Sequence, residues 1–266
     1  MKSRPVGGTS TAWTANGSRS ATSTRWTQEA AASSRAFSKK VIRSWLDGLT
    51  HVVAPPKCCL CYDLDTPPIC SECDAKLVPA WLGGCPRCGT GPTADCPFCI
   101  GLEGLDGARA AYVYEGAAGL AVRRLKFHRL VALGRPMSER MLPVLESAFP
   151  DADLIVPVPM HRLRMAMRGF NQSELLCSAF PQDRVRRDAL FRIRYTRQQA
   201  RLRGKERAMS LRGAFRATPE VAGRRVLLVD DVMTTGATLR ECADTIRSAG
   251  AVWVGALTFA RELPGV

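Results

Sequence analysis

The spacing of apolar residues alternates between strand-like and helix-like periods along the chain beyond residue 105. We predict strands at residues 108–115, 153–159, 226–229 and 251–259. We predict helices at residues 116–127, 135–149, 170–179 and 239–249. The run Val226–Val229 is apolar at every position, which is typical of a central parallel strand that is covered on both faces. Strands that alternate with helices predict an α/β fold with a parallel sheet flanked by helices.

Single residues refine the predicted limits of these helices. Pro143 lies inside the helix at 135–149 and predicts a kink or a break there. Asn171 or Ser173 is the expected N-cap of the helix at 170–179. Gly250 follows the helix at 239–249 and is its expected C-cap, because glycine adopts the left-handed conformation without strain.

Two segments with other patterns precede this alternation. Residues 1–38 are rich in Ser, Thr, Ala and Arg and bury too little apolar surface to offset ordering, so we expect a disordered tail. An over-extended start site and an organelle transit peptide stay open as alternatives. Helical spacing appears at residues 41–53 and ends before Pro55 and Pro56. We therefore predict a tail (1–38), an N-terminal helix with a cysteine-rich module (39–104) and an α/β domain (105–266).

The apolar runs and the net charge of the sequence indicate where the protein is located and which kind of partner it binds. No run approaches the roughly 20 apolar residues that span a membrane, and the N-terminus lacks the apolar core of a signal peptide. We therefore expect a soluble, cytoplasmic protein without a membrane span. The formal net charge is +14, and residues 161–216 hold 15 Arg and Lys against 4 Asp and Glu. This excess indicates a polyanionic ligand or partner, and a solvated arginine-rich surface is the alternative.

Eight of the 11 cysteines form four Cys-x-x-Cys pairs within a short segment. Each pair can present two thiolates to one tetrahedral ion. We predict two sequential four-cysteine sites for structural Zn²⁺, a double zinc ribbon, with the ligands Cys58, Cys61, Cys70 and Cys73 in one and Cys85, Cys88, Cys96 and Cys99 in the other. Interleaved pairs and a single occupied site stay open. Disulfides, an iron–sulfur cluster and a redox switch are the competing interpretations.

The segment Val226–Thr238, VLLVDDVMTTGAT, places two acids between an apolar strand and a loop of small residues. The loop precedes a helix, so its backbone N–H groups, its hydroxyls and the helix dipole can bind a phosphate. The chain has neither the Walker A pattern nor G-x-G-x-x-G. Asp230 and Asp231 are acceptors that suit the vicinal hydroxyls of a sugar. The segment therefore predicts a ribose 5-phosphate site at the carboxyl edge of the sheet.

This segment resembles the motif with which type I phosphoribosyltransferases bind phosphoribosyl pyrophosphate (PRPP). The resemblance implies that Asp230 and Asp231 form the catalytic pair and hold the ribose 2′- and 3′-hydroxyls. It also implies that the 5-phosphate is bound by the loop residues Thr234, Thr235, Gly236, Ala237 and Thr238.

Further motifs narrow the resemblance to the ComF (GntX-like) family, over about residues 46–259. The four cysteine pairs are followed by Leu125–Phe127 (LKF), Pro157–Pro159 (PVP), Arg168–Gln172 (RGFNQ), Thr196–Gln198 (TRQ) and Arg212–Phe215 (RGAF). The resemblance implies that Val158 and Pro159 lie in the pyrophosphate loop and that Arg168 lies in the mobile active-site loop. The chain departs from the family pattern at Ser210, where Asn is usual.

The resemblance implies two functions, and the sequence leaves the choice between them open. An enzyme would displace pyrophosphate from C1 of PRPP, with Mg²⁺ bridging the ligand's oxygens and arginines neutralising the leaving group. No segment can be assigned to binding an acceptor. A non-enzymatic protein of natural competence and DNA uptake would bind single-stranded DNA, with DNA-uptake proteins as partners.

Overall fold

The structure is a computed structural model that describes residues 55–80, 84–91, 96–99, 101–194 and 211–263. The predicted tail, the helix predicted at 41–53, the TRQ motif and Ser210 lie outside these residues. Within the described part of the chain, no helix is long and apolar enough to cross a membrane. The division of the chain at residues 38 and 104 stays a prediction.

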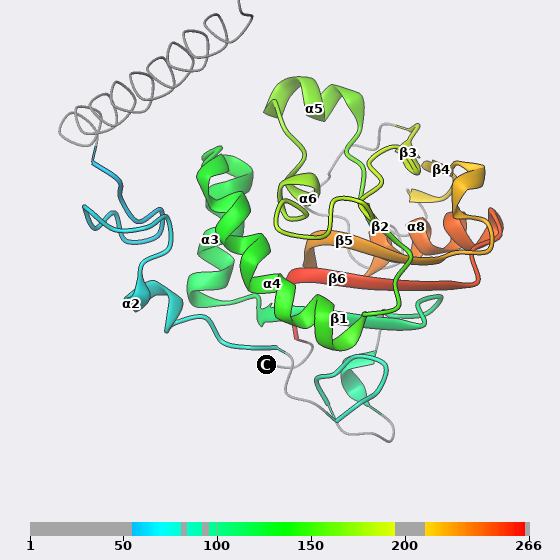
Figure 1. The fold of residues 1–266 in the computed structure, drawn as a ribbon, viewed down its shortest axis with the longest axis horizontal. Coiled ribbons are helices and arrows are strands. Elements are labelled where there is room, and N and C mark those ends of the chain that lie inside the picture. The colour runs from blue at the N-terminus through cyan, green and yellow to red at the C-terminus, as the bar shows by residue number, and fades with distance from the viewer. Residues whose placement is uncertain (1–54, 81–83, 92–95, 100, 195–210, 264–266) are drawn as a thin grey trace, which may run out of the picture. The chain divides into compact units, whose positions relative to one another are not determined.

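Four parallel strands form the central sheet in the order β1-β6-β5-β2 (Figure 1). They are β1 (Gly107–Val113), β2 (Leu154–Pro157), β5 (Arg225–Met233) and β6 (Trp253–Arg261). Each corresponds to one predicted strand, and the parallel sheet flanked by helices confirms the predicted fold class. Pro157, the last residue of β2, pairs with Val229 of β5, so the carboxyl ends of both strands meet at one edge of the sheet.

Helices cover both faces of the sheet (Figure 1). The first face carries α3 (Gly116–Phe127) and α4 (Gly134–Ala148), and the second carries α8 (Ala237–Ser248). Successive β5 residues point to opposite faces, so Leu227 and Val229 belong to the core under α3 and α4. Val226 and Leu228 belong to the core under α8. All four side chains are fully buried, as the continuous apolar run predicted.

The cysteine pairs extend these two cores. We call Cys58, Cys61, Cys70 and Cys73 the first cysteine group, and Cys85, Cys88, Cys96 and Cys99 the second cysteine group. Buried members of the first group pack in the α3/α4 core, and buried members of the second group pack in the α8 core. The guanidinium of Arg124 in α3 also donates to the carbonyl oxygen of Cys59. Each group therefore contributes buried cysteines to the core on a different face of the sheet.

The helix predicted at 170–179 is wrong in length, because α6 covers only Gln172–Leu175. Its N-cap is Asn171, whose side-chain oxygen accepts a hydrogen bond from the Ser173 N–H. Beyond α6 the hydroxyl of Ser138 in α4 donates to the carbonyl of Leu176 and accepts from the N–H of Ala179. These contacts satisfy backbone groups that a longer helix would have paired internally. Asn171 is therefore the cap, and tertiary hydrogen bonds end the helix early.

Other element limits also differ from the predictions. β5 continues through both acids to Met233, because that residue still pairs with Arg261 of β6. α8 begins two residues early, after Gly236, and its C-cap is Ala249, with Gly250 following at φ 98°. α4 continues through Pro143, so the helix does not break there.

Several short elements were not predicted. β3 (Leu190–Arg192) and β4 (Phe215–Ala217) form a two-stranded antiparallel sheet. The other short elements are the helices α2 (Ser71–Asp74) and α5 (Arg162–Arg168) and the 3₁₀ helices η1 (Pro97–Cys99), η2 (Val131–Leu133) and η3 (Pro219–Val221). α5 matters for the site because it follows the carboxyl end of β2 (Figure 1).

Candidate functional site

A cavity of about 250 Å³ lies at the carboxyl edge of the sheet. The segment after β2, the end of β5, the end of α3, the helices α5 and α6 and the start of α8 contribute to its lining. Among the lining residues are all those predicted for a sugar-phosphate site: Val158, Pro159, Arg168, Asp230, Asp231, Thr234, Thr235, Gly236, Ala237 and Thr238. The structure therefore brings the predicted residues together from distant parts of the chain.

The two acids have different surroundings. Asp231 is buried, its Oδ1 lies 2.9 Å from Lys126 Nζ, and its Oδ2 accepts from Gln172 Nε2 at 3.2 Å. Asp230 Oδ1 accepts from the Ser173 hydroxyl and from the Asp231 backbone N–H, both at 2.9 Å. Burial, followed by the charge of Asp231, raises the pKa of Asp230 to about 7. At neutral pH the cavity therefore holds one ion-paired carboxylate and one carboxyl group that is close to its titration midpoint.

The three residues whose side chains contact the acid pair, Lys126, Gln172 and Ser173, were not predicted as site residues. Lys126 and Gln172 lie in the LKF and RGFNQ motifs, which entered the sequence interpretation only as support for a resemblance. The sequence did indicate that such partners exist, because two adjacent acids at the end of a buried strand require a cation and hydrogen-bond donors nearby. Gln172 is 7% exposed, and its Oε1 has no hydrogen-bond partner among the described residues. This oxygen is itself buried, so it is a polar atom inside the site that no described group satisfies.

The loop Thr234–Thr238, called the phosphate loop below, leads directly into α8. Gly236 is the N-cap of α8 and has φ 72°, a conformation that favours glycine. Thr234 and Thr235 are exposed, whereas Gly236 is buried. The first N–H groups of a helix lack partners within the helix, and its dipole is positive at this end. The phosphate loop can therefore bind an anion through backbone and hydroxyl donors.

Arginines on α5 add positive charge to the cavity. Arg164 and Arg168 both line it. Burial lowers the pKa of Arg168, and the attraction of Asp231 opposes this effect. α5 has a defined start and end, because the side chain of His161 accepts from the Leu163 N–H and Gly169 is a left-handed C-cap. The two arginines can therefore add positive charge beside an anionic ligand.

The geometry of both cysteine groups fits a tetrahedral metal ion. Within each group the Sγ atoms lie within 4.8 Å of one another. The Sγ–Sγ separation is 3.6 Å for Cys61 and Cys70 and 3.4 Å for Cys88 and Cys96. Zn–S bonds of about 2.3 Å place tetrahedral sulfurs about 3.8 Å apart, so four thiolates in this arrangement suit Zn²⁺. The grouping is sequential, not interleaved, and none of these cysteines forms a disulfide.

Backbone N–H groups favour the thiolate at Cys58 and at Cys88, whereas burial and the neighbouring cysteines raise the pKa of Cys73 and of Cys99. Cys58 Sγ accepts from the N–H groups of Leu60 at 3.3 Å and Cys70 at 3.5 Å. Burial opposes ionisation, but these hydrogen bonds outweigh it and lower the pKa of Cys58 to about 6. Burial also opposes ionisation of Cys88, and backbone hydrogen bonds such as that from Gly91 lower its pKa to about 6. Thiolates are the form in which cysteine binds metal ions.

Comparison with known proteins identifies the class of this fold. The family model described as "Phosphoribosyl transferase domain" matches residues 185–263, which contain β5, the two acids and the phosphate loop. The parallel sheet flanked by helices agrees with that match. Residues 185–263 therefore form part of a phosphoribosyltransferase domain.

The relatives then identify the family. The chain is 34% identical over 208 residues to the "DNA utilization protein YhgH" of Salmonella typhi. The aligned region covers 73% of this chain and 91% of the relative. It is 31% identical over 150 residues to "Competence protein F" of Haemophilus influenzae, covering 52% and 65% of the two chains. It is 27% identical over 201 residues to "Competence protein ComFC" of Streptococcus pneumoniae, covering 73% and 87%. The chain belongs to the ComF family, as its motifs predicted.

Proposed function

We propose that the cavity binds PRPP, or another ligand that contains a ribose 5-phosphate group, together with Mg²⁺. The observation that carries this proposal is that a pair of acids and a helix N-terminus line one cavity at the carboxyl edge of the sheet. This edge is where ligands of open α/β sheets bind. The names of the relatives support a link to DNA uptake and competence, and the matching domain model supports a phosphoribosyl ligand.

Each part of such a ligand has matching groups in the cavity. The phosphate loop offers donors to the 5-phosphate, and Arg164 and Arg168 offer positive charge to a pyrophosphate. Asp230 and Asp231 offer carboxylate acceptors to the ribose hydroxyls. Lys126 and Gln172 fix Asp231 in place before any ligand arrives. Preorganised groups of this kind reduce the entropy cost of binding and of positioning C1 for displacement.

The oxygen atoms in this cavity also suit Mg²⁺. Carboxylate oxygens are hard ligands, and Asp230 and Asp231 supply such oxygens to the cavity. Mg²⁺ usually keeps several waters and binds through one or two carboxylates and the substrate's phosphates. When bound, it would neutralise charge on the leaving pyrophosphate. The two acids would orient the ribose, and the arginines would hold the pyrophosphate oxygens.

The assignment of the acids to the ribose hydroxyls is tested by comparing two sugar phosphates. We expect ribose 5-phosphate to bind more tightly than 2-deoxyribose 5-phosphate by about 1.5–3 kcal/mol, the usual contribution of a hydrogen bond to a charged group. Calorimetric titration of both compounds measures this difference. Both compounds carry the 5-phosphate, so this comparison does not test the proposed role of the phosphate loop. Equal affinities would contradict the proposed role of the acids.

The pH dependence of binding offers a second test. Because burial raises the pKa of Asp230 to about 7, its carboxyl group becomes a full acceptor only as the pH rises through 7. We expect affinity for ribose 5-phosphate to increase between pH 6 and pH 8. The second ionisation of the phosphate, near pH 6, also contributes. Asp230→Asn should therefore make the affinity for ribose 5-phosphate nearly independent of pH above pH 6.5. If the affinity of this variant still rises with pH as it does in wild type, ionisation of Asp230 is not the cause.

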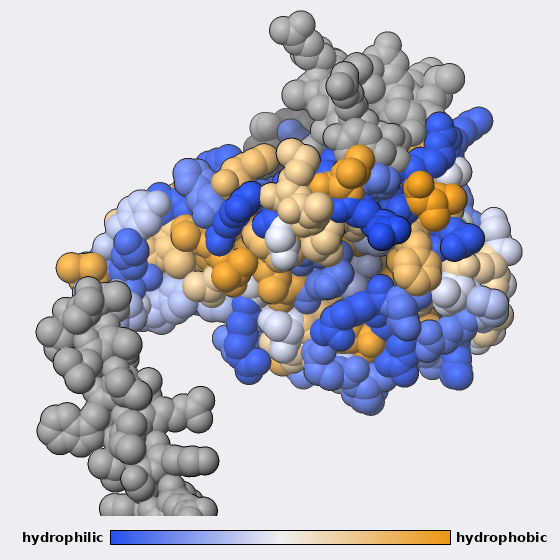
Figure 2. Space-filling model, turned by 90° about the horizontal axis from the view of Figure 1, so that it is seen from above, coloured by the Kyte–Doolittle hydropathy of each residue, from blue (hydrophilic) through white to orange (hydrophobic). Residues whose placement is uncertain are grey.

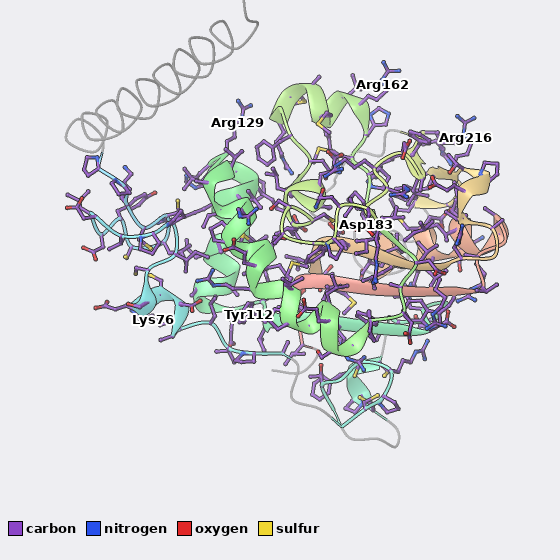
Figure 3. The ribbon with its side chains drawn as sticks, in the orientation of Figure 1. Lys76, Tyr112, Arg129, Arg162, Asp183 and Arg216 are labelled. Carbon is purple, nitrogen blue, oxygen red and sulfur yellow. The ribbon has the colours of Figure 1, made fainter. Side chains whose placement is uncertain are left out.

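A second candidate function is binding of single-stranded DNA beside the cavity. Phe127, which lines the cavity, is 70% exposed, and Leu163 and Met167 on α5 are also exposed. Figure 2, which views the α5 side, shows apolar residues interspersed with hydrophilic ones on this surface. Figure 3 shows Arg129 and Arg162 pointing outward on the same side of the domain. Exposed aromatic rings among arginines can stack bases and attract a phosphate backbone.

Five aromatic residues of the sequence are candidates for base stacking: Trp81, Phe98, Phe127, Phe170 and Tyr195. Of those that the structure describes, Phe127 alone is exposed enough for that role. Phe98 and Phe170 are partly buried and pack against the two cores. Trp81 and Tyr195 lie outside the described residues. Fluorescence anisotropy with a labelled oligothymidine at several salt concentrations tests this candidate. DNA binding that Phe127→Ala weakens, and that Asp230→Ala and the exposed control Val252→Ala do not, would support it.

A further inference from the structure

We propose that the second cysteine group, when it holds a metal ion, fixes the conformation of the phosphate loop through Gly101. Metal binding at this group and anion binding at the phosphate loop would then strengthen each other. Gly101 acts in this proposal as a positioning residue, since it contacts the backbone of the phosphate loop. The part that concerns anion affinity rests on the proposed function, whereas the part that concerns the conformation of the phosphate loop does not.

The first observation is a direct contact between two backbones. Gly101 follows Cys99 by two residues and has φ 84°, and Gly236 has φ 72°. A Cβ atom on Gly101 would lie 2.5 Å from the carbonyl oxygen of Thr235. A Cβ atom on Gly236 would lie 2.1 Å from the carbonyl oxygen of Gly101. The two segments therefore touch with no room for a side chain, and a shift in one displaces the other.

The second observation is that the segment after Cys99 is tied back to the second cysteine group. Leu102 and Leu105 are buried in the α8 core together with Cys85 and Cys88. The guanidinium of Arg87, which lies between these two cysteines, donates to the carbonyl oxygens of both leucines. The Leu102 N–H also donates to the Cys99 carbonyl at 3.1 Å. The position of Gly101 therefore depends on the fold of the second cysteine group.

The third observation is a polar link between the same segment and the first turns of α8. One carboxylate oxygen of Glu103 accepts from the Gly101 N–H at 3.2 Å, and the other pairs with Arg240 at 2.5 Å. Farther along, Asp106 pairs with Arg247 at 2.8 Å. Exposed ion pairs of this kind contribute little on their own. The backbone contact at Gly236 is therefore the main connection, and the ion pairs keep it aligned.

The first cysteine group has no such connection among the described residues and serves as the internal control. It packs in the α3/α4 core, where Arg124 donates to the Cys59 carbonyl. α3 carries Lys126, which contacts Asp231 and not the phosphate loop. Loss of metal from the first group should therefore disturb the acid pair, whereas loss of metal from the second should disturb the phosphate loop.

Small cysteine modules depend on their metal ion for folding. Without the ion the second cysteine group loses the interaction that holds its two pairs together, and Gly101 loses its anchor. The amides of the phosphate loop should then exchange with solvent more rapidly. Because coupling between two binding sites is reciprocal, an anion on the phosphate loop should in turn slow metal loss from the second group.

Hydrogen exchange measured by mass spectrometry on the full, zinc-loaded chain tests the mechanical part. Cys96→Ser should accelerate exchange in peptides that cover residues 232–242, and Cys61→Ser should leave these peptides unchanged. Gly101→Ala should have the same effect as Cys96→Ser while retaining zinc at both groups, so the result does not depend on a variant that loses metal. Equal exchange of these peptides in wild type, Cys96→Ser and Gly101→Ala would overturn the proposal.

Ribose 5-phosphate affinity tests the coupling, with a matched glycine as control. Gly223 also has a positive φ, 70°, but nothing lies within 4 Å of a Cβ there, so Gly223→Ala adds comparable strain without touching the phosphate loop. We expect Gly101→Ala to weaken binding by about fivefold or more, the lower end of typical coupling, and Gly223→Ala to leave it nearly unchanged. Equal affinities in the two variants would overturn the coupling. Absence of binding to wild type would count against the proposed function, and the exchange experiment would still decide the role of Gly101.

Discussion

Removal of metal from the two cysteine groups is expected to unfold both cysteine modules and to lower the free energy of unfolding of the whole protein by several kcal/mol. Structural zinc contributes about 10–16 kcal/mol in isolated zinc-finger peptides, and part of this would be lost here. The effect extends beyond the modules because buried cysteines of each group pack in the cores on the two faces of the sheet.

Metal analysis and thermal unfolding measure this effect. Freshly purified protein should contain about two zinc ions per chain, since each of the two cysteine groups offers four ligands to one ion. A strong chelator should lower the melting temperature, and zinc added back should restore it. Protein that is folded and contains essentially no zinc or other metal would refute the assignment of both groups.

Substitution of the two adjacent acids is expected to have different effects on stability. Asp231→Ala removes the partner of Lys126, whose side chain is 24% exposed, and also a hydrogen bond from Gln172. We expect the free energy of unfolding to fall by about 1–3 kcal/mol, less than the 3–5 kcal/mol for breaking a fully buried pair. Affinity for ribose 5-phosphate should fall as well, because the acid pair is disrupted.

Asp230→Asn should instead leave the protein at least as stable as wild type at pH 8. Burial raises the pKa of Asp230 from its ordinary 3.8 to about 7, so the folded state binds more protons than the unfolded state between these values. The contribution of Asp230 to the free energy of unfolding therefore falls as the pH rises from about 4 to 7. Above pH 7 the group is ionised in both states, and its ionised form destabilises the folded state. Denaturant titration of wild type and both variants at pH 8 measures the contrast. Equal destabilisation by both substitutions would contradict the different surroundings of the two acids.

Much of this fold follows from local sequence patterns. Continuous apolar runs and alternating periods predicted all four strands of the sheet, because burial on both faces requires them. The spacing of the cysteine pairs predicted the sequential grouping, since neighbouring pairs lie within reach of one ion. The residues predicted for the phosphate and the sugar line one cavity, because parallel strands place their carboxyl ends at one edge.

The features that escaped prediction depend on contacts between distant segments. The partner of Asp231 is Lys126 on α3, and the end of α6 depends on the Ser138 hydroxyl on α4. The acids lie inside β5, not beyond it, because β6 continues to pair with that strand. The contact between Gly101 and Gly236 joins residues far apart in the chain. No local pattern records these contacts, so only the assembled structure reveals them.

Calorimetric titration of PRPP with Mg²⁺ into the zinc-loaded wild type and into Asp230→Ala tests the proposed ligand most directly. We predict one saturable site in the wild type, weakened by about 1.5–3 kcal/mol in the variant, as expected for loss of a hydrogen bond to a charged group. Saturable binding would then justify a search for pyrophosphate release with bases and amines as acceptors. A folded, zinc-loaded wild type that does not bind PRPP, or a variant that binds it equally well, would contradict the proposed site.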